Sequence, residues 1–362
     1  MSWCCCGSPG QVRPSPLGRQ RARQGLEIHL RLREDNLILP AFKHQRAGPL
    51  RASGWRRRIK YLDLSLAVSR DVRVRVLESP GQWMPSDALV PLLESMRGVV
   101  RRGIGRDLDY GILSGDPERL RNAVITLLYD RKSGALIAFN ALSYMQLEVR
   151  GRATQALHLG LVMIDPAYRT QGLSWVLYGL TCMLLFVRRG LRPLWISNVT
   201  QVPAIIGKVA ESFVTAYPNP FQHSRRSFEH LSVAREIMRK HRAVFGVGPE
   251  AGFEEERFII TNAYTGGSDN LKKTFEEAPK HRDERANELC ASQLDYQRGD
   301  DFLQIARFDQ PSALRYLLRD VPRNSLPALL YRLAFLLLGR IVLPLAHWLN
   351  PNEPMGDLRA RS

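Results

Sequence analysis

The middle of the chain alternates between residue patterns typical of strands and patterns typical of helices. Val72, Val74 and Val76 alternate with arginines, and this period of two predicts a half-buried strand. After a turn rich in proline and glycine, Ser86 is placed to cap a helix whose apolar positions continue to Met96. This region is therefore predicted to begin with a strand followed by a helix.

Three further strands are predicted next, over residues 124–130, 135–147 and 156–164. The polar turn at 130–134 ends in glycine and joins the first two strands as a hairpin. A second hairpin, over residues 148–154, leads into the third strand. The third strand is apolar except for His158, which is typical of a strand buried on both faces.

A polar loop separates the third strand from a predicted helix. Asp165 and Pro166 end the strand, because proline has no N–H donor and restricts the residue before it. Residues 169–174 form the loop, and the apolar segment 175–189 predicts a mostly buried helix. A strand, a glycine-containing turn and a helix in this order can bind an anion, because the helix start carries unpaired N–H groups and a positive dipole end.

The residues of this loop resemble the acyl-CoA pyrophosphate loop of the GNAT superfamily of acetyl-CoA-dependent N-acyltransferases. The family pattern there is Gln or Arg, two residues, Gly, one residue, then Gly or Ala. Arg169 and Gly172 match this pattern. Ser174 departs from it, although serine is small and suits a helix start.

The order of the predicted elements is also similar to that family. A short strand at 194–197 and a helix at 203–213 follow the helix after the loop. The resemblance covers residues 71–230 and implies an α/β (α+β) fold, in which helices flank a mixed, mostly antiparallel central sheet. In this family the strand before the loop and the short strand after the helix splay apart, and acyl-CoA sits in the gap.

The resemblance implies acetyl-CoA or a longer acyl-CoA as co-substrate and transfer of its acyl group to an amine. The sequence does not identify the acceptor. Backbone of the strand before the loop pairs with the pantetheine arm in this family, which corresponds here to residues 162–164. The residues expected to bind the cofactor are Val162, Met163, Ile164, Arg169, Thr170, Gln171, Gly172, Leu173, Ser174 and Asn198.

The general base is left open between several residues. Family members often use a glutamate on the strand before the loop, or a water held by polar side chains, and this strand contains no carboxylate. His158 is its only titratable residue, with an ordinary pKa suited to a base, although a lone histidine in an apolar strand is more often structural. Asn140, Ser143 and Tyr144 on the neighbouring strand are candidates to hold a water instead.

The general acid is equally open. The family commonly carries a tyrosine in the second helix, about six residues before a closing phenylalanine, and counting back from Phe213 gives Lys208 or Gly207. Tyr178 and Tyr217 are candidate substitutes. These departures keep a second hypothesis in view, a catalytically silent GNAT-fold protein that binds acyl-CoA or a partner protein as a scaffold.

The net charge of +17 favours anionic partners, namely phosphorylated cofactors, nucleic acid or an anionic membrane surface. The basic N-terminal arm is poor in apolar residues and is expected to be disordered. It contains no recognised nucleic-acid motif, so nucleic acid is not expected as a partner. The five cysteines show no disulfide framework, which indicates a reducing cytoplasm.

The C-terminal region contains the most apolar run of the chain, residues 326–349. Arg332 and Arg340 argue against a membrane span. Two alternatives remain, an interfacial helix on an anionic membrane surface and a buried helix that packs on the α/β core or on a second copy of the chain. The expected regions are a basic arm (1–70), an acyl-CoA-binding domain (71–230), a polar helical extension or linker (231–320) and an apolar or amphipathic C-terminal helix with a tail (321–362).

Overall fold

The computed structural model describes residues 61–338 except 109, 170, 174, 223–225, 267, 324, 332 and 335–336. Most of the predicted basic arm and the end of the apolar C-terminal run therefore lie outside the described residues. Two of the expected cofactor-binding residues, Thr170 and Ser174, lie outside them as well.

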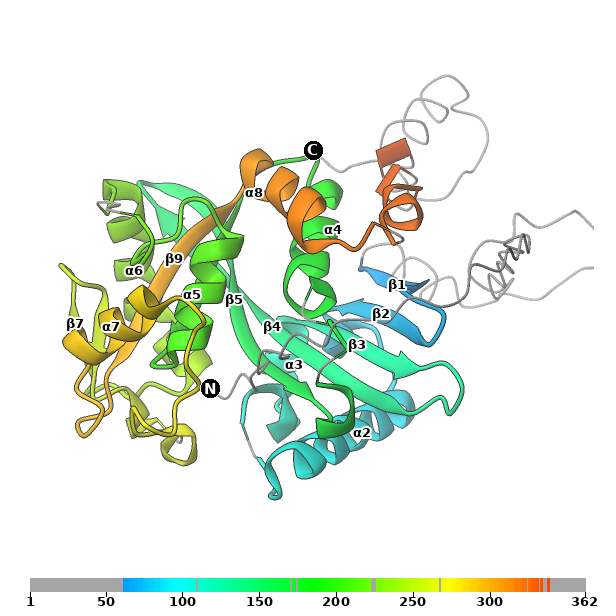
Figure 1. The fold of residues 1–362 in the computed structure, drawn as a ribbon, viewed down its shortest axis with the longest axis horizontal. Coiled ribbons are helices and arrows are strands. Elements are labelled where there is room, and N and C mark those ends of the chain that lie inside the picture. Colours follow the sequence, from blue (N-terminus) through cyan, green and yellow to red (C-terminus); the bar gives the residue numbers. More distant parts are fainter. Residues whose placement is uncertain are drawn as a thin grey trace, which may run out of the picture.

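The described residues form one nine-stranded sheet in the order β1-β2-β3-β4-β5-β6-β9-β8-β7 (Figure 1). Every strand pair is antiparallel except β5 with β6, which is parallel. The expected mixed, mostly antiparallel sheet is thus confirmed. The strands are β1 (Asp63–Ala67), β2 (Val72–Glu78), β3 (Ala123–Asp130), β4 (Leu136–Val149), β5 (Arg152–Ile164), β6 (Leu194–Thr200), β7 (Gly252–Glu254), β8 (Ile259–Thr261) and β9 (Asp301–Phe308).

Helices cover both faces of this sheet. The α-helices are α2 (Ser86–Ile104), α3 (Pro117–Arg121), α4 (Thr181–Arg188), α5 (Pro203–Ser212), α6 (Phe228–Lys240), α7 (Glu284–Gln293) and α8 (Gln310–Arg315). Two π-helical turns adjoin α4 and α8, namely η5 (Val176–Leu180) and η9 (Tyr316–Asp320). Short 3-10 turns are η2 (Pro80–Gln82), η3 (Gly111–Ser114), η4 (Pro166–Tyr168), η6 (Arg242–Phe245), η7 (Ala263–Thr265) and η8 (Asp269–Leu271).

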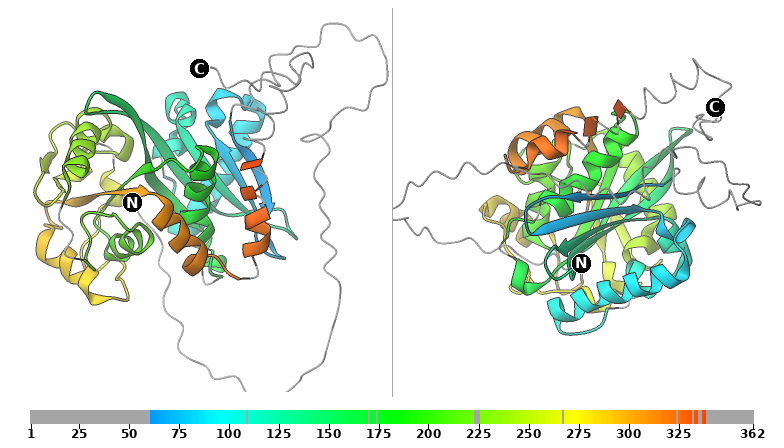
Figure 2. Two further views of the ribbon diagram at one scale, coloured as in Figure 1. Left: turned by 90° about the horizontal axis from the view of Figure 1, so that it is seen from above. Right: turned by 90° about the vertical axis from the view of Figure 1, so that its right-hand side faces the viewer.

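Strand β5 divides the hydrophobic core into two layers, because successive side chains of a strand point to opposite faces. Leu159 and Val162 pack in the layer that contains α4 and α5, whereas Leu161 and Met163 pack in the layer that contains α2 and α6. Figure 2 shows α2 on one side of the sheet and α4 with the C-terminal helices on the other. Burial on both faces explains why residues 156–164 are almost uniformly apolar.

Residues 231–320, expected as a polar helical extension or linker, also contribute β7, β8 and β9 to the sheet. Residues 302–308 of β9 pair with the whole of β6. The sequence pattern did not predict β9, because Asp301, Gln304 and Arg307 interrupt its apolar residues at every third position and hide the period of two.

The described part of the apolar C-terminal run packs on the core. Leu329 and Leu333 are buried against the layer of α4, and the Ser325 hydroxyl donates to the carbonyl of Val68 at 2.9 Å. Leu330, on the other side, is 45% exposed. Among the described residues, no helix has both the length and the apolar character needed to cross a membrane. These contacts favour the packed alternative for residues 326–338.

Truncating a side chain on the packed side of this segment is expected to destabilise the fold. Leu329→Ala should lower the free energy of unfolding by about 2–4 kcal/mol, because it leaves a cavity in the core. Leu330→Ala, its exposed neighbour, should change it by no more than about 0.5 kcal/mol. Urea denaturation of both variants tests this, and equally small losses would favour the interfacial alternative.

Candidate functional site

The two parallel strands β5 and β6 are paired over four residues each, 156–159 in the middle of β5 and 195–198 of β6. Their register runs from Ala156 opposite Trp195 to Leu159 opposite Asn198 and then stops. Beyond Leu159, β5 continues to Ile164 with β4 as its partner, while β6 continues with β9 as its partner. The strands therefore part, and the edge of β5 over residues 160–164 has no partner strand among the described residues.

A β-bulge lies where the two strands begin to part. Ala141 of β4 faces Leu161, but Ser143 faces His158, so β5 contains one additional residue in between. Gly160 is in this bulge, and a Cβ atom at this position would overlap the carbonyl oxygen of Ala141. Glycine thus allows β4 and β5 to stay together while β5 turns away from β6.

The predicted loop follows β5 directly. The Asp165 carboxylate accepts hydrogen bonds from the amide of Ala167 at 3.1 Å and from Arg102 Nε at 2.5 Å, which anchors the start of the loop. Gly172 has a φ of +66°, and a Cβ atom there would meet no atom within 4 Å. The loop therefore contains a left-handed residue beside open space immediately before η5 and α4.

The other expected cofactor-binding residues are placed around this loop and gap. Arg169 donates through Nη2 to the carbonyl of Gly103 at 2.9 Å, which joins the loop to the end of α2. Gln171 is exposed and Leu173 is buried against the layer of α4. Asn198 is buried, and its Nδ2 donates to Gln304 at 3.0 Å.

His158 is enclosed in the core on the α6 side of the sheet. Its Nδ1 lies 3.1 Å from the Ser197 hydroxyl, its ring contacts Phe245, and its Nε2 is buried without a partner among the described residues. Burial lowers the pKa of His158 to about 3, so the ring is neutral and weakly basic near pH 7. These features favour the structural alternative for this residue.

Tyr144 and Tyr178, the two tyrosines among the candidate catalytic residues, differ in their position relative to the loop. Tyr144 faces Leu157, where β5 and β6 are still close, and its hydroxyl donates to Glu78 at 3.0 Å. Burial raises the pKa of the Tyr144 hydroxyl above its usual value. Tyr178 lies in η5, just after the loop, and lines a pocket together with Lys208 of α5. Of the two, only Tyr178 is next to the loop.

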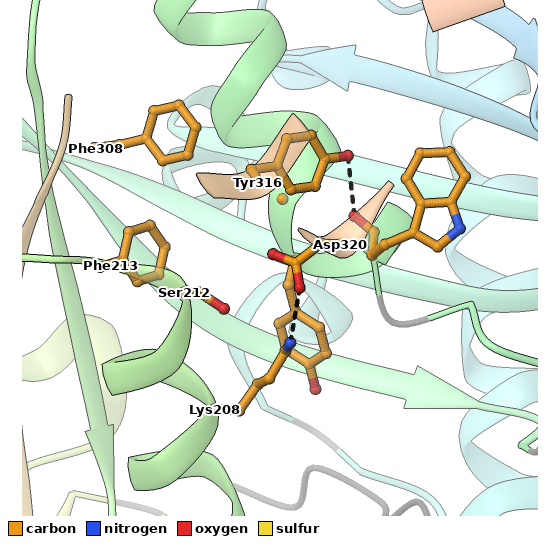
Figure 3. Close-up of a pocket in the computed structure, with 9 residues that line it drawn as sticks. Lys208, Ser212, Phe213, Phe308, Tyr316 and Asp320 are labelled. Atoms are coloured by element: carbon orange, nitrogen blue, oxygen red, sulfur yellow. Dashed lines mark hydrogen bonds and ion pairs between the residues drawn. The ribbon is translucent and has the colours of Figure 1, made fainter. Parts of the chain in front are cut away.

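This pocket lies between η5, α5 and the C-terminal turn η9 (Figure 3) and is small, because it leaves about 10 Å³ for the centre of a water molecule. Aromatic side chains line it, including Trp175, Tyr178 and Tyr316. The Lys208 ammonium forms an ion pair with Asp320 at 3.4 Å, shown dashed in Figure 3. The pocket thus combines apolar walls with one cation and one anion.

Carbonyl groups of the helix start accept hydrogen bonds from other elements. The Tyr316 hydroxyl donates to the carbonyl of Trp175 at 3.2 Å, and the Asn140 side chain donates to the carbonyl of Leu177. Such external donors replace helical hydrogen bonds and are typical of local π-helical widening. Gly179 makes room for Tyr316, because a Cβ atom at Gly179 would overlap the tyrosine ring.

Tyr316 and Asp320 line the pocket but are not predicted as site residues by the sequence. Both belong to a region expected to be a linker, and Asp320 is 112 positions from Lys208 in the chain. The one local signal was Gly179 inside an apolar helix, since glycine there is unfavourable and often marks a close approach by another element.

No protein-family model matches the sequence. No curated protein matches it either. Among solved structures the chain is similar to a GNAT family N-acetyltransferase (YhbS) from Escherichia coli in complex with CoA, with 19% identity and a TM-score of 0.27. The similarity covers 37% of this chain and 64% of that chain, so it spans less than two thirds of the length of that enzyme.

Proposed function

We propose that this protein binds an acyl-CoA in the gap between β5 and β6 and transfers the acyl group to an amine. The observation that carries the proposal is the divergence of the two parallel strands directly before a glycine loop and a helix start. Main-chain groups of residues 162–164 lie on the unpartnered edge of β5, where an extended pantetheine arm can pair with them as an added strand would.

The loop is proposed to hold the diphosphate of the cofactor. Gly172 has no side chain to obstruct the approach of a phosphate, and the helix start beyond it offers amide donors and a positive dipole end. Arg169 is proposed to add a charge-assisted contact. The same role is proposed for the backbone of Thr170, Gln171, Leu173 and Ser174, and Asn198 is proposed to contact the cofactor from β6.

The proposed reaction is attack of a neutral amine nitrogen on the thioester carbonyl carbon. The C–N bond forms, the C–S bond breaks, and the thiolate of CoA takes up a proton. Tyr178 and Lys208 are the groups proposed to supply that proton, because both line the pocket next to the loop. We propose a structural role for His158, since a ring with a pKa of about 3 is a poor base at neutral pH.

A catalytically silent acyl-CoA-binding or scaffold protein is the second candidate. The burial and weak basicity of His158 favour it, together with the lack of any carboxylate on β5. The acyl-CoA-binding form of this candidate shares cofactor binding with the transferase and differs from it in turnover, whereas a scaffold for a partner protein needs no acyl-CoA.

Calorimetric titration of the full chain with acetyl-CoA and with palmitoyl-CoA tests the shared part of both candidates. We expect saturable binding of one ligand with a dissociation constant between about 1 μM and 1 mM, the usual range for enzyme substrates. Release of free CoA thiol on addition of amines would then support the transferase, whereas binding without release would support the scaffold. A folded protein that binds neither ligand would contradict the transferase and leave the scaffold for a partner protein.

A further inference from the structure

Asp301, the first residue of β9, is a buried carboxylate with no cationic partner among the described residues. It is 5% exposed, and its one side-chain hydrogen bond within that part of the chain comes from the Tyr264 hydroxyl at 3.0 Å. The adjacent Asp300 differs, because Arg298 donates to both of its oxygens at 2.8 and 2.6 Å. An unpaired buried carboxylate is costly, and such groups are usually matched by a cation or neutralised.

In the part of the chain that the structure describes, no side chain that interacts electrostatically with Asp301 is positively charged. The titratable side chains of the described residues that interact electrostatically with it are Tyr110, Tyr264, Cys290, Tyr296 and Asp300. All are neutral or negative near pH 7. Burial raises the pKa of Asp301 to about 6, so its carboxyl gains and loses a proton close to neutral pH.

A second under-satisfied side chain lies beside it. The pairing of β6 with β9 ends with Thr200 opposite Phe302, so the next pair in this register is Gln201 opposite Asp301, on one side of the sheet. The Tyr296 hydroxyl donates to the carbonyl of Gln201 at 2.7 Å and also interacts with Asp301, which agrees with this placement. Gln201 is 1% exposed, yet neither its amide nitrogen nor its amide oxygen has a partner among the described residues.

These two side chains lie where the cofactor gap is open. Gln201 directly follows the C-terminal end of β6, the end at which β6 has separated from β5. Buried polar groups in folded proteins are almost always paired, so a carboxylate with one hydrogen bond and no cation next to an amide without a partner, both judged within the described residues, indicates a missing ligand. An ammonium group fits both, because it carries a positive charge and three N–H donors.

We propose that Asp301 binds the ammonium group of the acceptor and removes a proton from it, with Gln201 and Tyr264 positioning the two groups. This inference rests on the proposed acyl transfer and deepens it by assigning a cationic primary amine as the acceptor. The carboxylate takes one proton from the ammonium, and the neutral nitrogen then attacks the thioester carbon. As the C–S bond breaks, the thiolate takes its proton from Tyr178 or Lys208, the second proton of the nitrogen restores that group, and Asp301 returns its own proton to solvent.

The binding test uses the full chain, n-butylammonium chloride as probe and n-butanol as the uncharged match. At pH 8 the wild type should bind n-butylammonium and not n-butanol, measured by calorimetry or thermal shift. Asp301→Asn should weaken the binding of n-butylammonium at least tenfold and leave acetyl-CoA affinity within twofold. Asp107→Asn, at an exposed carboxylate that pairs with Arg101, is the control and should change neither. Equal affinity in wild type and Asp301→Asn, or no binding to the wild type, would overturn the proposal.

A second measurement needs no ligand. Because the pKa of Asp301 is raised in the folded state, the folded chain binds more protons than the unfolded chain between about pH 4 and pH 6. The contribution of the protonated Asp301 carboxyl to stability is fully present below pH 4 and is lost as the pH rises through 6. The urea midpoint of Asp301→Asn should therefore equal that of the wild type at pH 4 and exceed it at pH 8. A wild-type midpoint that exceeds that of the variant at pH 8 would show that a cation already compensates Asp301 and would overturn the proposal.

Failure of the proposed acceptor site and failure of the proposed function give different results. If acetyl-CoA binds but n-butylammonium does not, the acceptor site is wrong and the cofactor site stands. If neither acetyl-CoA nor palmitoyl-CoA binds, the proposed function itself fails, whatever the result at Asp301.

Discussion

Gly172→Glu should abolish acyl-CoA binding, with affinity for the preferred acyl-CoA at least about 100-fold lower than in the wild type, equivalent to about 3 kcal/mol. Two effects act together. The residue has a φ of +66°, which disfavours any side chain. The new carboxylate would also stand at the helix start proposed to hold the diphosphate, where it repels the ligand and competes for the same donors.

Two further variants separate these effects in the same calorimetric titration. Gly172→Ala imposes the backbone strain without the charge and should weaken binding only a few-fold. Gly134 has a similar φ of +73° and equally open surroundings, but it lies in the turn between β3 and β4. Gly134→Glu therefore matches the strain and the charge away from the site and should bind acyl-CoA like the wild type. Unchanged affinity in a folded Gly172→Glu protein would contradict the proposed diphosphate site.

Gly160→Ala should lower the free energy of unfolding by about 3 kcal/mol or more, the upper range for overpacking a well-packed core. The new methyl group would overlap the carbonyl oxygen of Ala141, a backbone atom held in the centre of the sheet. A backbone atom cannot move aside as a flexible side chain can, so the bulge of β5 has to open or shift. Because this bulge lies where β5 leaves β6, the variant should also weaken acyl-CoA binding in the fraction that folds.

Gly98→Ala is the matched control for this substitution. Gly98 lies inside α2, and its added Cβ atom would make an ordinary contact at 3.4 Å with the end of the Arg102 side chain. Alanine favours the helix over glycine, so this variant should be more stable than the wild type by about 0.5–1 kcal/mol. Urea denaturation compares the two directly. A Gly160→Ala protein as stable as the wild type would mean that the bulge does not have the tight geometry described above.

The predicted elements of the central region agree with the structure because their signals are local. The alternation of Val72, Val74 and Val76 gave β2, and the uniformly apolar run before Asp165 gave β5. The strand β9 was missed for a physical reason. Its buried polar residue Gln304 forms hydrogen bonds with groups far away in the chain, including the side chain of Asn198 and the carbonyl of Pro218. Hydrogen bonds to such distant residues cannot be predicted from a local sequence pattern.

For the candidate site, too, the residues with a local sequence signal were predicted and those brought in by distant contacts were not. A loop motif carries Arg169 and Gly172 within a few residues, so the sequence identified both, and the left-handed φ of Gly172 agrees with its predicted place in a turn. The sequence also singled out His158, but its low pKa results from burial in the core, which only the tertiary structure shows. Tyr316, Asp320 and Asp301 come from residues that look like a polar extension.

The sequence by itself determined the fold class, the order of the central elements and the loop between β5 and α4, because periodicity, turn residues and a short motif depend on neighbours in the chain. Only the tertiary structure decided which polar groups meet. It brought Lys208 to Asp320 across 112 positions, buried His158, and left Asp301 beside Gln201 without a cation in the part of the chain that it describes. Burial and charge pairing depend on contacts between distant segments, and those contacts exist only once the sheet has formed.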